Sequence, residues 1–222
     1  IYGALSGSIF SLKAETMYEV EIQVNQNDEI KNYSYEFTTR PDSPPIDPSK
    51  VYYLSEIYNG GQLDLEALNI FGSPDGYAKI IGDGAIISPD EGDLAAVNIG
   101  RQSYVMFENL TIRGGLRYGI FADRTHHSWI KGCDIAEFGR TAYEYRGGKA
   151  YSSAESSSPI NYDSGIYLEK SGIAVIEDCE IHNPNLGANH WGNGHPNGAN
   201  AIQMWAYHPD VEKRGQFIIR NN

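Results

Sequence analysis

Short apolar strings return at a fixed spacing along the second half of the chain. One short apolar string recurs at residues 96–99, 119–122, 165–168 and, more loosely, 201–204. Its second and third copies have the form Gly-Ile-x-φ, where φ is apolar. A second apolar string recurs in step with it and begins at Phe107, Ile130, Ile176 and Ile219. The first step is 23 residues and the next is 46, which is two periods. Alternation within each string predicts short strands with one buried face.

A strand of this length cannot bury its own apolar face, so repeats of this kind must stack on one another. The period of 23 residues disfavours a left-handed hexapeptide helix because it is not a multiple of six. The leucine-asparagine consensus of leucine-rich repeats is absent as well. The pattern therefore predicts a solenoid of stacked β coils.

The strings Ile-x-x-Cys/Asn-x-Ile and Gly-Ile-x-φ resemble the right-handed parallel β-helix repeat of the pectate-lyase-like superfamily. Residues 72–84 also resemble the entry coils of that superfamily. The resemblance covers about Lys50 to Asn222 and implies an all-β fold, most often found in secreted enzymes that cut polysaccharides. We expect a secreted, periplasmic or cell-surface protein, of bacterial origin. The repeat is still running at Asn222, so we expect the helix to be truncated there.

A different pattern occupies the first forty residues. Residues 17–24 and 33–39 alternate between apolar and polar positions and predict an antiparallel hairpin. Residues 12–22 resemble the later strands of a fibronectin type III domain, in which a tyrosine, here Tyr18, ties a loop to the start of a strand. We therefore expect three segments: the C-terminal part of a fibronectin type III-like β-sandwich at 1–40, a proline-rich linker at 41–49, and the β-helix at 50–222.

Two loops interrupt the repeat at the same point of the coil, residues 140–163 and 184–200. Because they follow equivalent strands, they project from one edge and predict the wall of a groove. In the second loop, Trp191 offers a flat face for a sugar ring, and His190 and Asn197 offer hydrogen-bonding partners. His195 is the candidate base. The alternative is an Asn/Gly-rich turn with a packed tryptophan.

The first loop supplies two further candidates. Asp163 is a candidate catalytic carboxylate, and Arg146 is a candidate ligand for a substrate carboxylate or sulfate. A solvated surface is the alternative for Arg146.

Side chains alternate across a strand, so positions beside the buried isoleucines face outward. We expect the carboxylates Asp123 and Glu169 to be neighbours on one outward face that borders both loops, with Gly100 equivalent to Asp123. Substrate-binding candidates on the same face are Tyr167, Lys170, Gln203 and Trp205.

Two adjacent carboxylates need a proton, a cation or a basic partner. A shared proton suits glycoside hydrolysis. A Ca²⁺ ion held by Asp123 and Glu169 suits β-elimination, with His195 removing the proton. The structural alternative is neutralisation by Arg101, Arg124 and Lys170. On a further strand, Glu108, Lys131 and Glu177 align and predict a solvated ion-pair ladder.

Net charge and cysteine content narrow the function. A formal charge of −12 and a pI near 4.8 argue against a nucleic-acid partner. No apolar run is long enough to span a membrane. Cys133 and Cys179 fall in the same inward slot, where we expect stacked thiols rather than a disulfide.

We therefore expect a polysaccharide-degrading enzyme that acts on a polysaccharide or oligosaccharide substrate. A lyase acting by β-elimination on an acidic polymer is the first expectation, and a glycoside hydrolase with a carboxylate pair is the alternative. The second alternative is a non-catalytic carbohydrate-binding or adhesin β-helix, whose usually short, uniform loops differ from the two insertions here.

Overall fold

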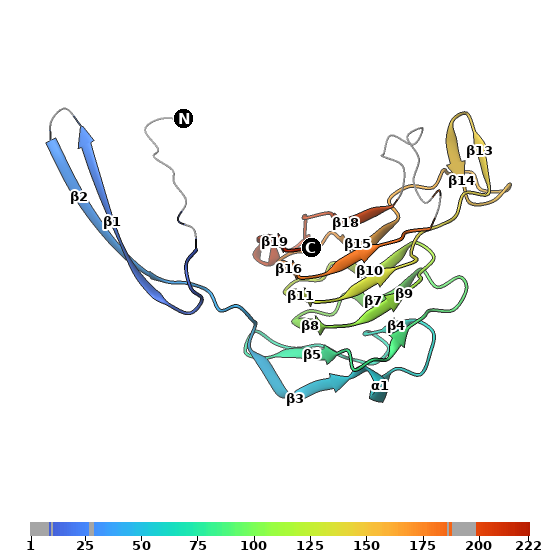
Figure 1. Ribbon diagram of the computed structural model, residues 1–222, viewed down its shortest axis with the longest axis horizontal. Coiled ribbons are helices and arrows are strands. Elements are labelled where there is room, and N and C mark those ends of the chain that lie inside the picture. The colour runs from blue at the N-terminus through green and yellow to red at the C-terminus, as the bar shows by residue number, and fades with distance from the viewer. Residues whose placement is uncertain (1–8, 10, 27–28, 186, 188–198) are drawn as a thin grey trace. The chain divides into compact units, whose positions relative to one another are not determined.

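The chain forms two compact units, Ile1–Pro44 and Pro45–Asn222 (Figure 1). The computed structural model describes residues 9, 11–26, 29–185, 187 and 199–222. Strand β3 (Ile46–Tyr53) begins inside the segment expected to be a linker. This strand lies at the edge of its sheet, and its pairing register shifts between Ile46 and Val51. Pro48 lies within that shift, so its lack of an N–H costs the sheet no hydrogen bond.

The first unit is an antiparallel hairpin of β1 (Met17–Gln26) and β2 (Glu29–Thr38). Its register places Tyr18 opposite Phe37, and their rings lie 6.1 Å apart. The phenolic oxygen of Tyr18 accepts a hydrogen bond from the backbone N–H of Lys13 at 2.8 Å. This bond back to an upstream backbone group is the contact of a tyrosine corner.

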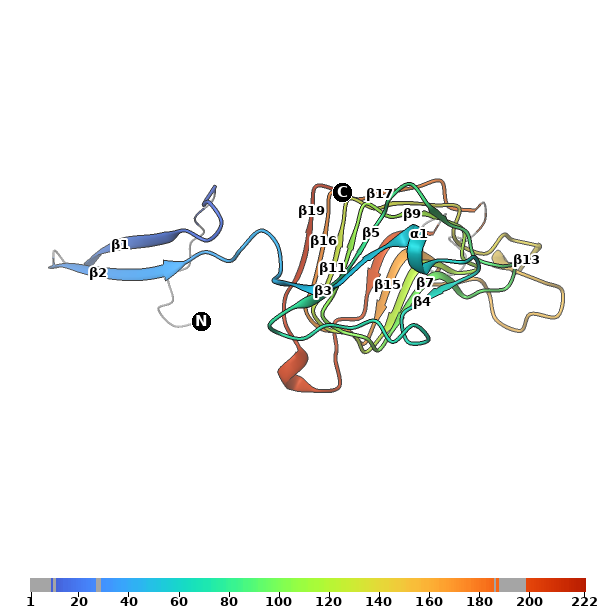
Figure 2. The same cartoon turned by 90° about the horizontal axis from the view of Figure 1, so that it is seen from below.

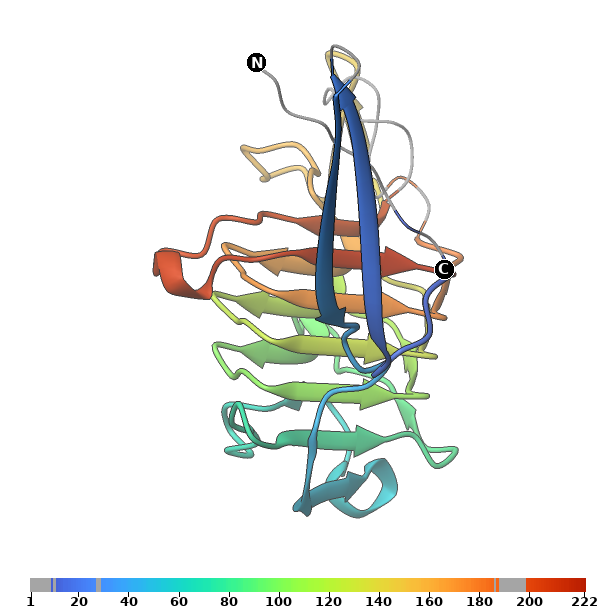
Figure 3. The ribbon, with the colours of Figure 1, turned by 90° about the vertical axis from the view of Figure 1, so that its left-hand side faces the viewer.

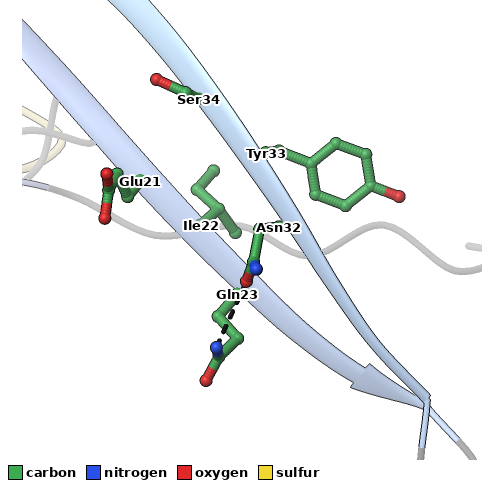
Figure 4. Close-up of a pocket in the computed structure, with 6 residues that line it drawn as sticks. All are labelled: Glu21, Ile22, Gln23, Asn32, Tyr33 and Ser34. Carbon is green, nitrogen blue, oxygen red and sulfur yellow. Dashed lines mark hydrogen bonds between the residues drawn. The ribbon is translucent and has the colours of Figure 1, made fainter.

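The two faces of this hairpin differ in polarity. Ile22 lies opposite Tyr33 on the apolar face, and Gln23 donates a hydrogen bond to Asn32 at 3.2 Å on the polar face (Figure 4). Antiparallel pairing confirms the expected kind of module at this end of the chain. The fibronectin type III assignment stays a prediction.

The second unit winds through three parallel sheets in turn, and its coils stack in chain order (Figures 2 and 3). The five-stranded sheet contains β4 (Leu63–Asp64), β7 (Ala95–Gly100), β10 (Tyr118–Asp123), β15 (Ser164–Glu169) and β18 (Asn200–Met204). The six-stranded sheet contains β3, β5 (Tyr77–Ile81), β8 (Val105–Glu108), β11 (Ser128–Lys131), β16 (Ala174–Glu177) and β19 (Phe217–Arg220). The four-stranded sheet contains β6 (Ile86–Ile87), β9 (Thr111–Arg113), β12 (Asp134–Ala136) and β17 (Glu180–His182).

A few elements lie outside these sheets. The short helix α1 (Leu54–Ile57) lies next to β3, and the first inserted loop carries an antiparallel pair, β13 (Glu144–Arg146) and β14 (Lys149–Tyr151). Within the described residues, no helix is long and apolar enough to cross a membrane.

The observed register confirms the 23-residue repeat. Ile120 pairs with Val97 on one side and with Ile166 on the other, and all three are fully buried. One expectation was wrong: Gly100 pairs with Ala122, not Asp123, because the register shifts after Phe121. Gly100 has a φ of 60°, so β7 turns its corner with a left-handed residue.

The glycine of the Gly-Ile string is explained by close approach of the next coil. A Cβ on Gly119 would lie 2.5 Å from Ile135 Cγ2 and 2.6 Å from the carbonyl oxygen of Gly165. A Cβ on Gly165 would overlap Ile181 in the same way. Only glycine lets the five-stranded sheet approach the four-stranded sheet at this corner.

The two cysteines lie buried in neighbouring coils, at the shared inward position that the repeat predicts. A hydrogen bond with Cys179, together with burial, holds the pKa of the Cys133 thiol well above its usual value. Such a thiol stays protonated and acts as a small apolar residue.

The sequence predicted a solvated ion-pair ladder of Glu108, Lys131 and Glu177. This prediction is wrong for Glu177, which is buried and only 1% exposed. Its carboxylate accepts hydrogen bonds from Trp129 Nε1 at 3.0 Å and Arg220 Nε at 2.6 Å, and Lys131 Nζ lies 3.0 Å away. Burial works to raise the pKa of this carboxyl, but the three partners outweigh it and the pKa lies below its usual value.

Candidate functional site

The outward face of the five-stranded sheet lies between two edges of the solenoid. At one edge, where both inserted loops begin, a cleft of about 460 Å³ runs across the turns of four coils. Its lining includes Asp90, Arg113, Leu116, Glu137, Arg140 and Asn185. A cleft is therefore present at the edge for which the one-sided loops predicted a groove.

Three aromatic rings occupy the middle of this face. Tyr118 and Phe121 stack with ring centroids 5.2 Å apart, and Tyr118 and Tyr167 lie 5.0 Å apart. Tyr118 is 3% exposed and Tyr167 8% exposed. Burial raises the pKa of Tyr118 to about 12. Tyr167 was predicted to bind substrate on this outward face, but it packs inside the cluster, where its two aromatic neighbours cover it.

The two outward carboxylates lie at the other end of the strands. Asp123 pairs directly with Glu169 across β10 and β15, as expected. Asp123 Oδ2 lies 3.6 Å from Arg101 Nε and 3.4 Å from Arg124 Nη1. Glu169 Oε1 lies 3.1 Å from Lys170 Nζ. Neutralising cations therefore accompany both acids.

Arg101, Asp123, Arg124, Glu169 and Lys170 form a charged row at this end of the strands. One oxygen of Asp123 differs from the other carboxylate oxygens of the charged row. Oδ1 is buried, and no donor within the described residues hydrogen-bonds to it. A carboxylate oxygen in that situation is costly unless some group approaches it. This is the unexplained polar atom of the site.

The carboxylates lie at the end of the strands away from the loops. The loops leave near the start of β10, and Asp123 lies five positions further along this extended strand than Tyr118, which is about 16 Å. The face is therefore an open strip with loops and cleft on one side and the charged row on the other.

Trp205 and Gln203 continue the face into the next coil. Trp205 is 52% exposed, and Lys170 Nζ lies 5.3 Å from the centroid of its ring. Gln203 Oε1 accepts hydrogen bonds from Ser164 Oγ at 3.1 Å and Asn200 Nδ2 at 2.9 Å. Trp205 is therefore the open platform of this face, while Gln203 is held by its neighbours.

Asp163 has a different place from the one expected. It is fully buried, and its two oxygens accept four hydrogen bonds from Arg117 and Arg140. A carboxylate saturated in this way cannot approach a substrate. Asp163 instead closes the base of the first loop.

Four residues of the second loop, His190, Trp191, His195 and Asn197, lie outside the described residues. Arg146 lies in the β13–β14 hairpin, where its guanidinium stacks 3.7 Å from the ring of Tyr151 and pairs with Glu144 at 2.9 Å. It is thus occupied within its own hairpin.

The residues present do not fit a calcium cradle. Ca²⁺ takes about six to eight oxygen ligands, whereas Asp123 and Glu169 supply two carboxylates that already face cations. Among the residues that the structure describes, no group of three or more His, Cys, Asp or Glu side chains is placed to hold a metal ion. We therefore derive no step through a metal.

One arrangement of charged residues was not predicted from the sequence. Asp134 Oδ1 hydrogen-bonds to His182 Nε2 at 2.8 Å, and Arg113 forms a bidentate pair with the same carboxylate. The Arg113 bonds, aided by His182 and opposed by burial, lower the pKa of Asp134. The repeat aligns Arg113 and His182 with Ala136, and Asp134 lies two positions before Ala136 on the same face of β12. Aligning the third strand of each coil would therefore have predicted that Asp134, Arg113 and His182 are neighbours.

Comparison with known proteins bears on the fold. A family model described as the right handed beta helix region matches residues 95–183, the coils from β7 to β17. Neither a search of curated proteins nor a search of solved structures found a match. The predicted fold class, an all-β chain with a right-handed parallel β-helix behind an antiparallel module, is confirmed.

Proposed function

We propose that this chain is part of a carbohydrate-active enzyme that binds a polysaccharide along the outward face of the five-stranded sheet. The observation that carries the proposal is the Asp123–Glu169 pair, with one unpartnered carboxylate oxygen, beside the exposed ring of Trp205. A polymer that crosses the face from the cleft to the charged row would contact both the carboxylate pair and the ring of Trp205. Polymeric substrates are met outside the cell, which supports a secreted, periplasmic or surface location in a bacterium.

Hydrolysis is the reaction that this pair supports best. Neighbouring parallel strands lie about 4.8 Å apart, close to the roughly 5–5.5 Å between the two carboxyl groups of retaining glycosidases. In that reaction one carboxylate attacks the anomeric carbon while the other, protonated, donates its proton to the leaving oxygen. Water then releases the sugar and restores the proton. In this scheme Asp123, whose side chain is 25% exposed, is the nucleophile, and Glu169 is the acid.

Elimination is the second candidate, favoured by the cations of the row. Arg101, Arg124 and Lys170 lie beside the two carboxylates, and a uronic-acid carboxylate would find the same partners. His195 is the proposed base for removing the adjacent proton. This reaction leaves an unsaturated sugar, whereas hydrolysis does not.

The test is a cleavage assay on a panel of neutral and acidic polysaccharides. Reducing ends without ultraviolet absorbance indicate hydrolysis, and reducing ends with it indicate elimination. Asp123→Asn and Glu169→Gln should each lower kcat at least about a hundredfold if the pair reacts. Glu180→Gln is the matched control, because Glu180 is an exposed carboxylate on another sheet.

Three outcomes would count against the proposal. Activity equal to that of the wild type in both Asp123→Asn and Glu169→Gln would remove the pair from the reaction. Binding of polysaccharide without cleavage would favour a carbohydrate-binding or adhesin helix. Absence of both binding and cleavage would overturn the proposal.

A further inference from the structure

The segment between β18 and β19 reaches back to the turn that follows β10. His208 lies in this segment and is 6% exposed. Its Nε2 lies 3.1 Å from the carbonyl oxygen of Arg124 and donates to it, because a carbonyl oxygen can only accept. Its Nδ1 lies 3.0 Å from the backbone nitrogen of Asp210, which donates to it, and 3.2 Å from the carbonyl oxygen of the same residue. His208 thus joins the last described coil to a coil two turns earlier.

Arg124 is a residue whose backbone needs support. Its φ is 58°, a left-handed conformation that costs a residue with a long side chain free energy. Its N–H donates to the carbonyl oxygen of Glu169 at 2.9 Å, and its carbonyl accepts from His208. Both main-chain groups of Arg124 are therefore held, which fixes the direction in which its side chain leaves the turn toward Asp123.

The segment that carries His208 is itself anchored. Arg214 Nε donates to the carbonyl oxygen of His208 at 2.7 Å, and the Arg214 guanidinium lies 3.9 Å from the ring of Tyr207. Gly172 in the intervening coil has no room for a Cβ because the carbonyl of Lys213 lies against it. The imidazole therefore sits on a packed support and not on an open loop.

We infer that His208 is a positioning residue for the carboxylate pair: it holds the backbone of Arg124 so that the guanidinium stays beside Asp123. This inference rests on the proposed function for its effect on catalysis. The effect on Arg124 itself does not depend on any substrate.

Two near-isosteric variants separate the two nitrogens of the ring. His208→Asn places an oxygen where Nδ1 accepts from Asp210 but cannot reach Arg124. His208→Gln places an N–H donor near the position of Nε2. Val211→Ala is the matched control, because it changes a residue of the same segment that is 65% exposed and leaves the bond to Arg124 intact.

The first measurement is the NMR relaxation of the Arg124 Nε–H group in the whole chain, with thermal unfolding as the check on folding. His208→Asn should make this group more mobile, while His208→Gln and Val211→Ala should leave it as in the wild type. An unchanged Arg124 signal in His208→Asn overturns the inference. Equal loosening in His208→Asn and Val211→Ala also overturns it, since that would be general loosening of the segment.

The second measurement is cleavage of whichever polysaccharide the wild type cuts. His208→Asn should lower kcat about tenfold with KM unchanged, and His208→Gln should restore most of it. An unchanged kcat overturns the catalytic role. If the wild type cuts nothing, the proposed function fails, and the relaxation measurement alone decides whether His208 positions Arg124.

Discussion

Asp163 and Arg140 are joined by three hydrogen bonds, one from the main-chain N–H of Arg140 at 2.8 Å and two from its guanidinium at 2.7 and 3.0 Å. These residues are the two ends of the first inserted loop. The pair therefore closes the loop at its base. Arg117, from the previous coil, adds a further donor, with its Nε 3.1 Å from Asp163 Oδ1. Asp163, which the sequence suggested as a catalytic carboxylate, instead holds the inserted loop on the solenoid.

Asp163→Asn should destabilise the protein by about 3–5 kcal/mol, because it leaves two arginines facing a buried neutral amide. Urea unfolding at neutral pH measures this cost. Glu144→Gln, which breaks a partly exposed pair with Arg146 in the same loop, should cost less than about 1 kcal/mol. Equal costs for the two variants would contradict the role given to Asp163.

The coils could be predicted from sequence because their signal is local and repeated. Ile120 and Ile166 are apolar residues at a fixed offset, and stacking of coils turns that offset directly into strand pairing. The shift at Gly100 could not be read from the offset, because a left-handed corner residue moves the pairing by one position without changing the apolar pattern.

The site was harder to predict because a charge in a sequence does not show its partners. Asp123 and Glu169 lie on regular strands, so their adjacency was predicted correctly. In the sequence, Asp163 and Glu177 could not be distinguished from partly exposed carboxylates such as Asp123 and Glu169. In the structure, arginine and lysine side chains surround both Asp163 and Glu177. His208 was missed because its partner is a backbone carbonyl, which no residue pattern marks.

Glu177→Gln should cost about 2–3 kcal/mol at neutral pH, since it weakens charge-assisted hydrogen bonds at a buried carboxylate. The folded-state pKa of Glu177 lies below its ordinary value, so its contribution is fully present above about pH 4.5 and is lost as the pH falls through the folded pKa. Unfolding free energies measured at neutral and acidic pH should therefore converge for wild type and variant at the acidic end. A difference that stays constant with pH would contradict this assignment.

Gly165→Ala should destabilise the β-helix by about 1–3 kcal/mol through overpacking, because the added methyl meets Ile181 Cγ2 and the carbonyl of Ala201. Gly147→Ala is the control. Its Cβ would meet open space, so only its φ of 56° is strained, and we expect a cost of about 1 kcal/mol. Thermal unfolding compares the two, and a smaller cost at Gly165 would contradict the close approach of the coils.

The stability of the β-helix should fall between about pH 6.5 and pH 4 through His126. Burial, together with the neighbouring His127, Lys213 and His208, lowers the pKa of His126 from 6.5 to about 4, and Asp210 opposes this shift. Tyr104 also packs against the ring, at 5.2 Å. The unfolded chain takes up a proton near pH 6.5 while the folded chain does not, so unfolding becomes easier as the pH falls.

His126→Phe removes this titration and keeps an aromatic ring against Tyr104. Lowering the pKa from 6.5 to about 4 corresponds to about 3 kcal/mol, so the stability of the wild type should drop by about that much more than that of the variant from pH 7 to pH 4. Urea unfolding at a series of pH values gives both curves. Acids and histidines that do not interact with His126 contribute equally to the two proteins. The difference between the curves therefore reports His126 together with its interactions with His127, His208 and Asp210. Parallel curves would show that this imidazole is protonated in the folded protein as readily as in the unfolded chain.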